Sequence, residues 1–274
     1  MNKLIKLLLY IILSLGAFSM IFPFLWMILT SMMQNSQIFS FPPTFIPKPL
    51  ILDNYEKVLG NMPILKYFYN SMFVAVVTTI GQVIIASMAG FAFAKMKFRF
   101  KEPLFVIILL TMMIPPQVNI VPLFFIMREL HMINTFGALI LPGLFGGFGI
   151  FLMRQWFKSM PDELIDASKI DGCNYFEMFF KIAFPLSLPA IMTLAVFTFI
   201  TMWNSFMWPL IVTNSDTIRT LPVAIAGLKG SYRETIEWGQ LMACAVITTI
   251  PVILIFLAGQ KYFINGIMQT GSKE

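Results

Sequence analysis

The stretch DASKIDGCNYFEMFFKIAFPLSLPA, residues 166–190, joins a charged segment to a long apolar one. Acidic and basic side chains alternate at its start, the pair Asp171-Gly172 follows, and Pro185 and Pro189 open the apolar run. Glycine commonly reverses the chain at the C-terminal end of a helix. The stretch therefore predicts two short helices with a tight turn between them, leading into a hydrophobic segment.

The rest of the chain is apolar. Of 274 residues, 58% are hydrophobic and only 12% are charged, with a mean hydropathy of +0.81, whereas soluble domains carry roughly 25% charged residues. A membrane-spanning helix needs about 20 apolar residues. Six segments qualify: 7–31, 72–94, 104–127, 136–153, 184–206 and 241–260. We therefore expect an all-α polytopic membrane protein with six transmembrane helices, forming one transmembrane domain over residues 1–274, with a bend at Pro115-Pro116.

Basic residues give the expected orientation. The loop KMKFRFKE between the second and third segments holds Lys95, Lys97, Arg99 and Lys101, and short basic loops remain in the cytoplasm. Both termini and the charged insert at 154–183 then lie on the cytoplasmic side. The segments expected outside are about 34–70 and about 207–240.

The six segments contain no Asp, Glu, Lys, Arg or His. Proton-coupled carriers place such groups inside the membrane, so a proton relay in this chain is disfavoured. The uncharged polar residues of the segments have two open interpretations: helix–helix hydrogen bonds, or the lining of a path for a neutral, hydroxyl-rich solute. The candidates for such a path are Thr78, Gln82, Trp203, Asn204 and Ser205. For Trp203 the alternative is an aromatic belt at the membrane interface.

The sequence shows no motif for nucleotide binding and no pattern of catalytic residues. It has no phosphate-binding loop of the G-x-x-x-x-G-K-[ST] type and no Gly-Lys pair. No nucleophile–base pair or metal-ligand cluster stands out, so no catalytic residue, metal site or cofactor is predicted. The net charge of +6 is assigned to cytoplasmic loops and anionic lipid rather than to nucleic acid. Free energy for transport would enter through a partner.

The insert at 154–183 carries helix caps. Ser159 with Asp162 is predicted to cap the helix DELIDASKI, and Asn174 with Glu177 is predicted to cap YFEMFFKI. Its charge is nearly balanced, whereas a lipid-binding amphipathic helix is strongly basic. This pattern favours an elbow that fits a groove in another protein; a merely solvated loop is the alternative.

The same residues carry a family resemblance. DASKIDGC followed by FFKIAFPLSLPA resembles the cytoplasmic coupling motif, the EAA loop, of ATP-binding-cassette importer permeases, with Asp166 in place of Glu and Ser168 in place of the second Ala. The tail QKYFINGIMQTGSKE resembles that of the shorter permease subunit of maltose-type systems. Gly90 stands where relatives often have Tyr, which is expected to loosen the inner end of the second segment. Other stretches are similar to the carbohydrate-uptake branch: NSMFVAVVTTIGQVIIASMAGFAFAK, MIPPQVNIVPLFFIM, GIFLMRQWFKSMPDELIDAS, TFITMWNSFMWPL and RTLPVAIAGL.

The resemblance implies an assembly in the bacterial cytoplasmic membrane. Two permease subunits, expected to form a heterodimer, would work with two ATP-binding subunits and an extracytoplasmic solute-binding protein. ATP and Mg would be bound by the partner subunits, which would drive alternating access. The tail after Gly266 would reach between the ATP-binding subunits. Coupling to them would fall on five residues: Asp166, Ala167, Ser168, Asp171 and Gly172. Among these, Ala167 and Ser168 would allow close helix approach, and Gly172 would set the turn.

A carbohydrate is the cargo that this resemblance implies. The same type of importer could instead carry glycerol phosphate or a sugar acid. A secondary transporter acting alone is a further alternative, which the docking elbow and the lack of clear inverted repeats disfavour. A membrane scaffold without transport activity would leave the similarity along the chain unexplained.

Overall fold

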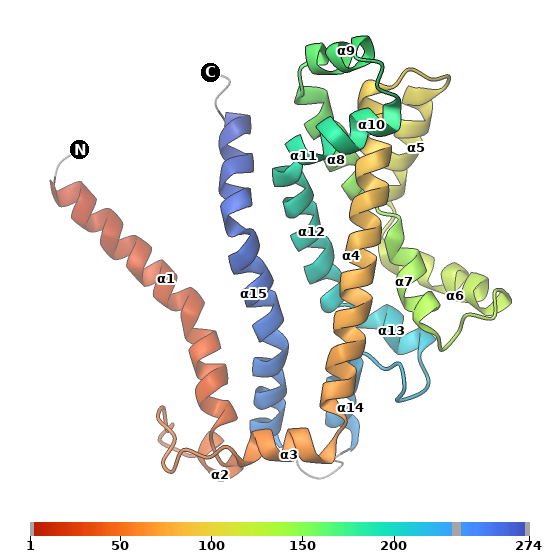
Figure 1. Ribbon diagram of the computed structural model, residues 1–274. Helices are drawn as coiled ribbons and strands as arrows, with labels where there is room; N and C mark the ends of the chain where they lie inside the picture. Colours follow the sequence, from red (N-terminus) through yellow and green to blue (C-terminus); the bar gives the residue numbers. More distant parts are fainter. Residues whose placement is uncertain (1–2, 232–236, 272–274) are drawn as a thin grey trace. The chain divides into compact units, whose positions relative to one another are not determined.

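The computed structural model describes residues 3–231 and 237–271, and every regular element among them is a helix (Figure 1). The elements are α1 (Lys3–Ser31), α2 (Asn35–Ile38), α3 (Asp53–Asn61), α4 (Ile64–Lys95), α5 (Lys101–Met113), η1 (Pro116–Asn119), α6 (Ile120–Glu129), α7 (Phe136–Leu144), α8 (Gly147–Ser159), α9 (Asp162–Ile170), α10 (Tyr175–Met178), η2 (Phe179–Ala183), α11 (Phe184–Leu186), α12 (Leu188–Trp203), α13 (Met207–Val212), α14 (Leu221–Ser231) and α15 (Trp238–Gly271). The prediction for the tail after Gly266 falls on side chains outside the described part of the structure.

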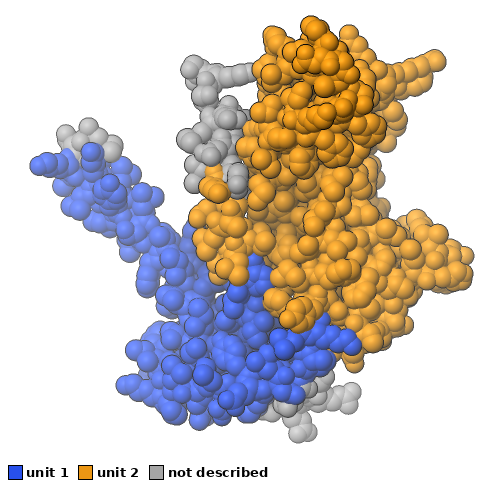
Figure 2. Space-filling model, viewed as in Figure 1, with its two compact units in different colours: residues 1–66, 224–251 blue, residues 67–223, 252–274 orange. Residues whose placement is uncertain are grey.

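The chain forms two compact units, which Figure 2 shows in separate colours. The first comprises residues 1–66 and 224–251, and the second comprises residues 67–223 and 252–274. The prediction of one transmembrane domain over residues 1–274 stays a prediction.

The predicted membrane-spanning segments fall on apolar helices. Four are long enough to cross a membrane: Lys3–Ser31, Ile64–Lys95, Phe136–Ser159 and Trp238–Lys261. Two further candidates are bent pairs: Lys101–Met113 with Pro116–Glu129, at 94°, and Tyr175–Leu186 with Leu188–Trp203, at 79°. The polytopic helical architecture is thus confirmed, as is the bend at Pro115-Pro116. That bend is sharp because Pro116 supplies no amide hydrogen to continue α5.

In the first unit, α3 is held against the chain that leaves α1. The Asn54 side-chain amide donates to the carbonyls of Ser31 and Met33, at 2.9 Å each. The hydroxyls of Tyr55 and Ser31 share a hydrogen bond of 2.7 Å. The predicted loop at 34–70 therefore contains ordered helices, and α4 begins at Ile64 rather than at 72.

The second unit has a core to which α4, α8, α9, α10, η2 and α12 all contribute. Phe91 of α4 packs edge-on against Phe157 of α8 at 5.5 Å, and its ring lies 5.6 Å from that of Phe179 in η2. Ile165 of α9 and Met178 of α10 are buried in the same cluster. The segment from α9 to η2 therefore contributes side chains to the core and is not a loop that lies outside it.

Gly90 lies where α4 and α8 approach each other most tightly. A Cβ atom at this position would come within 2.6 Å of the Met153 Cβ and 2.8 Å of the Arg154 backbone nitrogen. One turn earlier on α4, Ala86 faces Gly149 of α8. Small residues four apart allow helix backbones to approach closely in membranes. The expectation that Gly90 loosens this end of α4 is therefore wrong, because the missing side chain permits contact.

We predict that Gly90→Val separates α4 from α8 and destabilises the protein by about 1–3 kcal/mol, the usual cost of overpacking. The measurement is the thermal unfolding midpoint of the purified protein in detergent. Gly16→Val is the matched control, because no described atom would lie within 4 Å of a Cβ at Gly16 of α1. Equal midpoints for the two variants would contradict the prediction.

Candidate functional site

We call α9 and α10, with the turn between them, the elbow. The N-terminal cap of α9 differs from the predicted one. Helix α9 covers DELIDASKI as expected, but its N-cap is Pro161, with no side-chain cap. The Ser159 hydroxyl instead donates to the Trp156 carbonyl at 2.7 Å. The predicted Ser159–Asp162 cap is wrong because α8 continues to Ser159, whose hydroxyl bonds within that helix.

The turn at Gly172 has the predicted form. Gly172 has a φ of +79°, and its amide donates to the Lys169 carbonyl at 3.0 Å. The Cys173 amide donates to the Ser168 carbonyl at 3.0 Å. These two bonds make a Schellman motif. After the turn, the capping box between Asn174 and Glu177 is confirmed, with both bonds at 3.0 Å.

The five predicted coupling residues do not share one face. Ser168 is 2% exposed, and its hydroxyl donates to the Ile165 carbonyl, so it belongs to the packed side of α9. The other four are exposed: Asp166, Ala167, Asp171 and Gly172. Beside them, the Ile170 side chain is 87% exposed.

A cluster that the sequence did not reveal ties the elbow to the neighbouring helices. The Lys95 side chain, 5% exposed, ends α4 and donates at 2.6 Å to the Met160 carbonyl and at 2.6 Å to Asp162 Oδ1. The hydrogen bond from Lys95 holds the pKa of the Asp162 carboxyl below its usual value. Because this pKa is lowered, the Asp162 carboxylate is ionised at neutral pH and keeps its ion pair with Lys95. The ion pair is lost only as the pH falls through the lowered pKa.

Two further cations complete this cluster. Arg154 of α8, 5% exposed, donates from one terminal nitrogen to both carboxylate oxygens of Glu102 at 2.9 Å, and from Nε to the Phe93 carbonyl at 3.2 Å. Its guanidinium lies 3.8 Å from the centre of the Phe105 ring. Lys101 donates to two more carbonyls of the chain at the end of α4, those of Ala94 and Met96. We call Lys95, Lys101, Arg154, Glu102 and Asp162 the cation joint.

Two adjoining cavities, about 520 and 730 Å³ in volume, lie in the second unit. Asn204 and Ser205 line the first, and Gln82 lines the second, as expected for a path. None of the described residues that line them is ionisable. Six residues line both: Pro116, Leu123, Pro142, Gly143, Thr201 and Met202. The shared lining makes the two cavities parts of one uncharged surface, which is mainly apolar and carries a few amide and hydroxyl groups.

Two predicted path residues lie behind this lining. Trp203 is 1% exposed and packs between Phe199, at 5.9 Å and nearly parallel, and Phe68, at 5.3 Å. Thr78 is fully buried, and its hydroxyl has no partner among the described residues. The aromatic residue that does border the first cavity is Trp208, whose indole donates to the Ala138 carbonyl at 2.8 Å.

The first cavity also contains a polar group that sequence reasoning missed. Thr220 lines it, is 4% exposed, and has a hydroxyl without a partner in the described part of the chain. Buried hydroxyls are normally paired. The Thr220 hydroxyl oxygen is itself buried, so it would bond a solute only when the lining opens around it.

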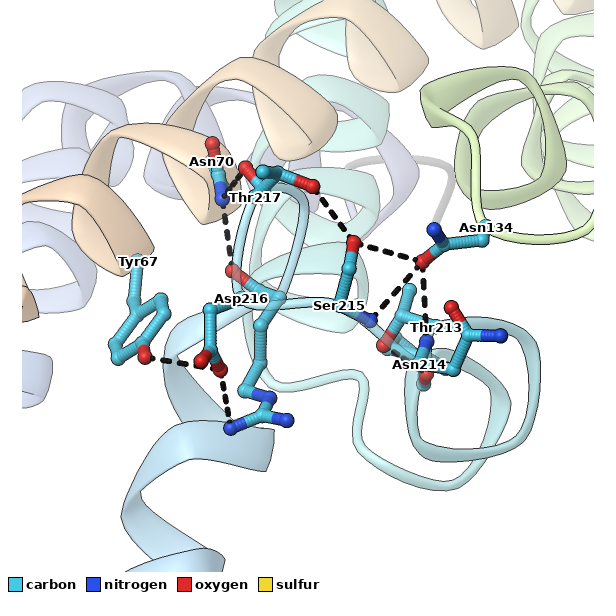
Figure 3. A network of polar contacts seen from close by, with 10 residues as sticks. Tyr67, Asn70, Asn134, Thr213, Asn214, Ser215, Asp216 and Thr217 are labelled. Carbon is cyan, nitrogen blue, oxygen red and sulfur yellow. Dashed lines mark hydrogen bonds and ion pairs between the residues drawn. The ribbon is translucent and has the colours of Figure 1, made fainter.

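A polar network holds the segment that presents Thr220 (Figure 3). The Asn134 side-chain oxygen accepts bonds from the Asn214 amide at 3.0 Å and from the Ser215 amide at 3.1 Å. The Asn70 amide of α4 donates to the carbonyls of Thr217 and Arg219, at 3.0 and 2.9 Å. Nothing in the local sequence marked these asparagines, because their partners are distant in the chain.

Comparison with known proteins identifies the family. Residues 82–269 match the model of the binding-protein-dependent transport system inner membrane component. The arabinooligosaccharides transport system permease protein of Halalkalibacterium halodurans is 34% identical over 94% of this chain and 92% of its own. The lactose transport system permease protein of Rhizobium radiobacter is 34% identical over 94% and 93%. The sn-glycerol-3-phosphate permease of Yersinia enterocolitica is 29% identical over 95% of each chain.

A solved structure shares the fold. It is a chain of a bacterial ABC transporter involved in the import of the acidic polysaccharide alginate. The two structures align with a TM-score of 0.85 and 22% identity, over 95% of this chain and 97% of the other. The family model and the permease relatives show that the chain is a permease component, which has no ATPase site of its own. The chain belongs to the inner-membrane components of binding-protein-dependent transport systems.

Proposed function

We propose that this chain is one of two permease subunits of an ATP-driven importer for a neutral carbohydrate. The observation that carries the substrate class is the lining of the two cavities, which offers amide and hydroxyl groups and no ionisable side chain among the described residues. Their volumes fall in the range of about 300–1,000 Å³ that is usual for ligand pockets. The names of the arabinooligosaccharide and lactose relatives support the same class.

Residues that line the cavities would contact the sugar directly, and buried ones would support them. Asn204, Ser205 and Gln82 supply side-chain donors and acceptors, and the unpaired Thr220 hydroxyl, buried just beneath the lining, would add another when the lining opens. Trp203 and Thr78, which are buried, act as supports behind the lining. The glycerol-3-phosphate relative favours a phosphate ester as the second candidate. That cargo would need cations from the partner subunit, because the described lining supplies none.

The elbow would dock into a cleft of an ATP-binding subunit, with ATP and Mg bound there and no cofactor in this chain. The contact surface would be the exposed side of α9, including Asp166, Ala167 and Ile170, with Asp171 and Gly172 at the turn. Ser168 would fix this surface from beneath. A second permease subunit, forming a heterodimer, and an extracytoplasmic solute-binding protein complete the proposed assembly. Both termini are proposed to lie in the cytoplasm.

We predict that Gly172→Val disrupts docking while leaving membrane insertion intact. A β-branched residue in the left-handed conformation costs about 1–2 kcal/mol, so the turn between α9 and α10 should change shape. The assay isolates complexes from native membranes through a tag on this chain and measures the bound ATP-binding subunit and vanadate-sensitive ATP hydrolysis. Both should be lost. Gly60→Val, at a position with no described atom within 4 Å of the added Cβ, is the control. Normal amounts of ATP-binding subunit in the Gly172 variant would refute docking through this turn.

We predict that Thr220→Val impairs uptake without impairing folding. Replacing an unpaired hydroxyl with a methyl group should leave stability nearly unchanged, whereas a lost bond to the sugar should weaken its apparent affinity about 3- to 10-fold. The experiment measures uptake of radiolabelled arabinotriose, lactose and sn-glycerol-3-phosphate by cells expressing the importer. Thr193→Val, whose hydroxyl bonds the Pro189 carbonyl away from the cavity lining, is the control. Uptake of sn-glycerol-3-phosphate alone would overturn the proposed substrate class.

A further inference from the structure

We infer that Arg154 and Lys95 are positioning residues that make α4, α5, α8 and α9 move as one body when an ATP-binding subunit acts on the elbow. This inference rests on the proposed docking of α9. It adds a route by which docking reaches the cavities: through the cation joint into α4, whose residues Ser71, Val74 and Gln82 line them.

The first step concerns the backbone at the end of α4. The last four carbonyl groups of a helix have no partners inside it. At the end of α4, the Phe93 carbonyl accepts from Arg154 of α8, and the carbonyls of Ala94 and Met96 accept from Lys101 of α5. Donors from two other helices therefore fix this end of α4, and neither α5 nor α8 can shift without breaking these bonds.

The second step concerns the geometry of Arg154. One terminal nitrogen bonds both oxygens of Glu102, Nε bonds the Phe93 carbonyl, and the flat face lies on the Phe105 ring. A planar guanidinium held in several directions has little freedom to rotate. Arg154 therefore locks α8 to both α4 and the start of α5, which a flexible lysine at the same position would not do.

The third step connects the joint to α9. Only Met160 and Pro161 separate α8 from α9. Lys95 binds the carbonyl of the first and the carboxylate of Asp162, the first residue of α9. The first residue of α9, which carries the exposed docking surface, is thus bonded to the last residue of α4. Displacement of α9 would therefore be passed directly to α4.

The other side of the elbow is built differently. Between α10 and α12 the chain passes through the π-helix η2 and the short helix α11, and the path bends by 79°. π-Turns and bends interrupt the regular hydrogen-bond ladder of a helix. The elbow is therefore fastened to α4 by side-chain bonds but joined to α12 by an irregular backbone, and α12 contacts the other helices through apolar packing of residues such as Leu194.

The test measures how the cavity responds to nucleotide. In a complex reconstituted in nanodiscs, Cys173→Ser and Cys244→Ala remove the native thiols, and Ile120→Cys places a reporter thiol in the lining of the first cavity. Labelling by a polar maleimide is compared without nucleotide and with ATP plus vanadate. We expect Arg154→Gln to reduce the nucleotide-dependent change in labelling rate about fivefold or more, while the ATP-binding subunits stay bound and hydrolyse ATP. Lys95→Gln should act in the same direction.

Arg128→Gln is the matched control, because it removes an exposed ion pair with Glu129 in α6, outside both the elbow and the cation joint. It should retain the full response. Retention of the response in both Arg154→Gln and Lys95→Gln overturns the inference, and loss of the ATP-binding subunits from both counts against it equally. Should Arg154→Gln fail to assemble, Lys95→Gln decides alone, since its partner Asp162 is mostly exposed. Absence of ATP-binding subunits from the parent complex refutes the proposed docking instead.

Discussion

The backbone carbonyls at the end of α4 need hydrogen-bond donors, and the way they obtain them organises the second unit. Their donors are cations from α5 and α8, Lys101 and Arg154, rather than residues of α4 itself. The loop between α4 and α5 must therefore be short and must reverse the direction of the chain. It does so through Phe100, which has a φ of +63°. Lys95 extends the same arrangement to α9. One local requirement of helix chemistry thus brings four helices together beneath the elbow.

Features that depend on neighbouring residues were predictable from sequence, and those that depend on distant packing were not. The six apolar segments are recognised by their length, because a helix that crosses the bilayer needs about 20 apolar residues. The Gly172 turn and the Asn174 cap are recognised from residue types that favour these backbone conformations. The prediction that Ser159 caps α9 was wrong, because the sequence did not show that α8 continues as far as Ser159. The role of Gly90 depends on contact with α8, far along the chain. Lys95 was predicted only as one of several cytoplasmic charges, since its partners near α9 leave no pattern around it.

The candidate path shows the same limit. Residue type identified Asn204, Ser205 and Gln82, all of which line a cavity. It did not separate Trp203 from Trp208, because both lie in one aromatic stretch. The separation arises where α12 ends at Trp203 and α13 begins at Met207: the first indole is buried, and the second borders the cavity. Thr220 lies outside every apolar run, so no hydropathy pattern could suggest that it lines a cavity.

Along α4, the residues that line the cavities and the residues of the cation joint occupy separate positions. Ser71 and Gln82 face the cavities, whereas Lys95 and the carbonyls bound by the cation joint lie at the end of the helix. With a rise of 1.5 Å per residue, about 20 Å of continuous helix separates Gln82 from Lys95. The charges of the joint therefore lie well away from the described cavity lining, while an unbroken helix still carries displacement over that distance. The same helix can then transmit mechanical work and present a neutral surface to a sugar, because each task uses a different part of its length.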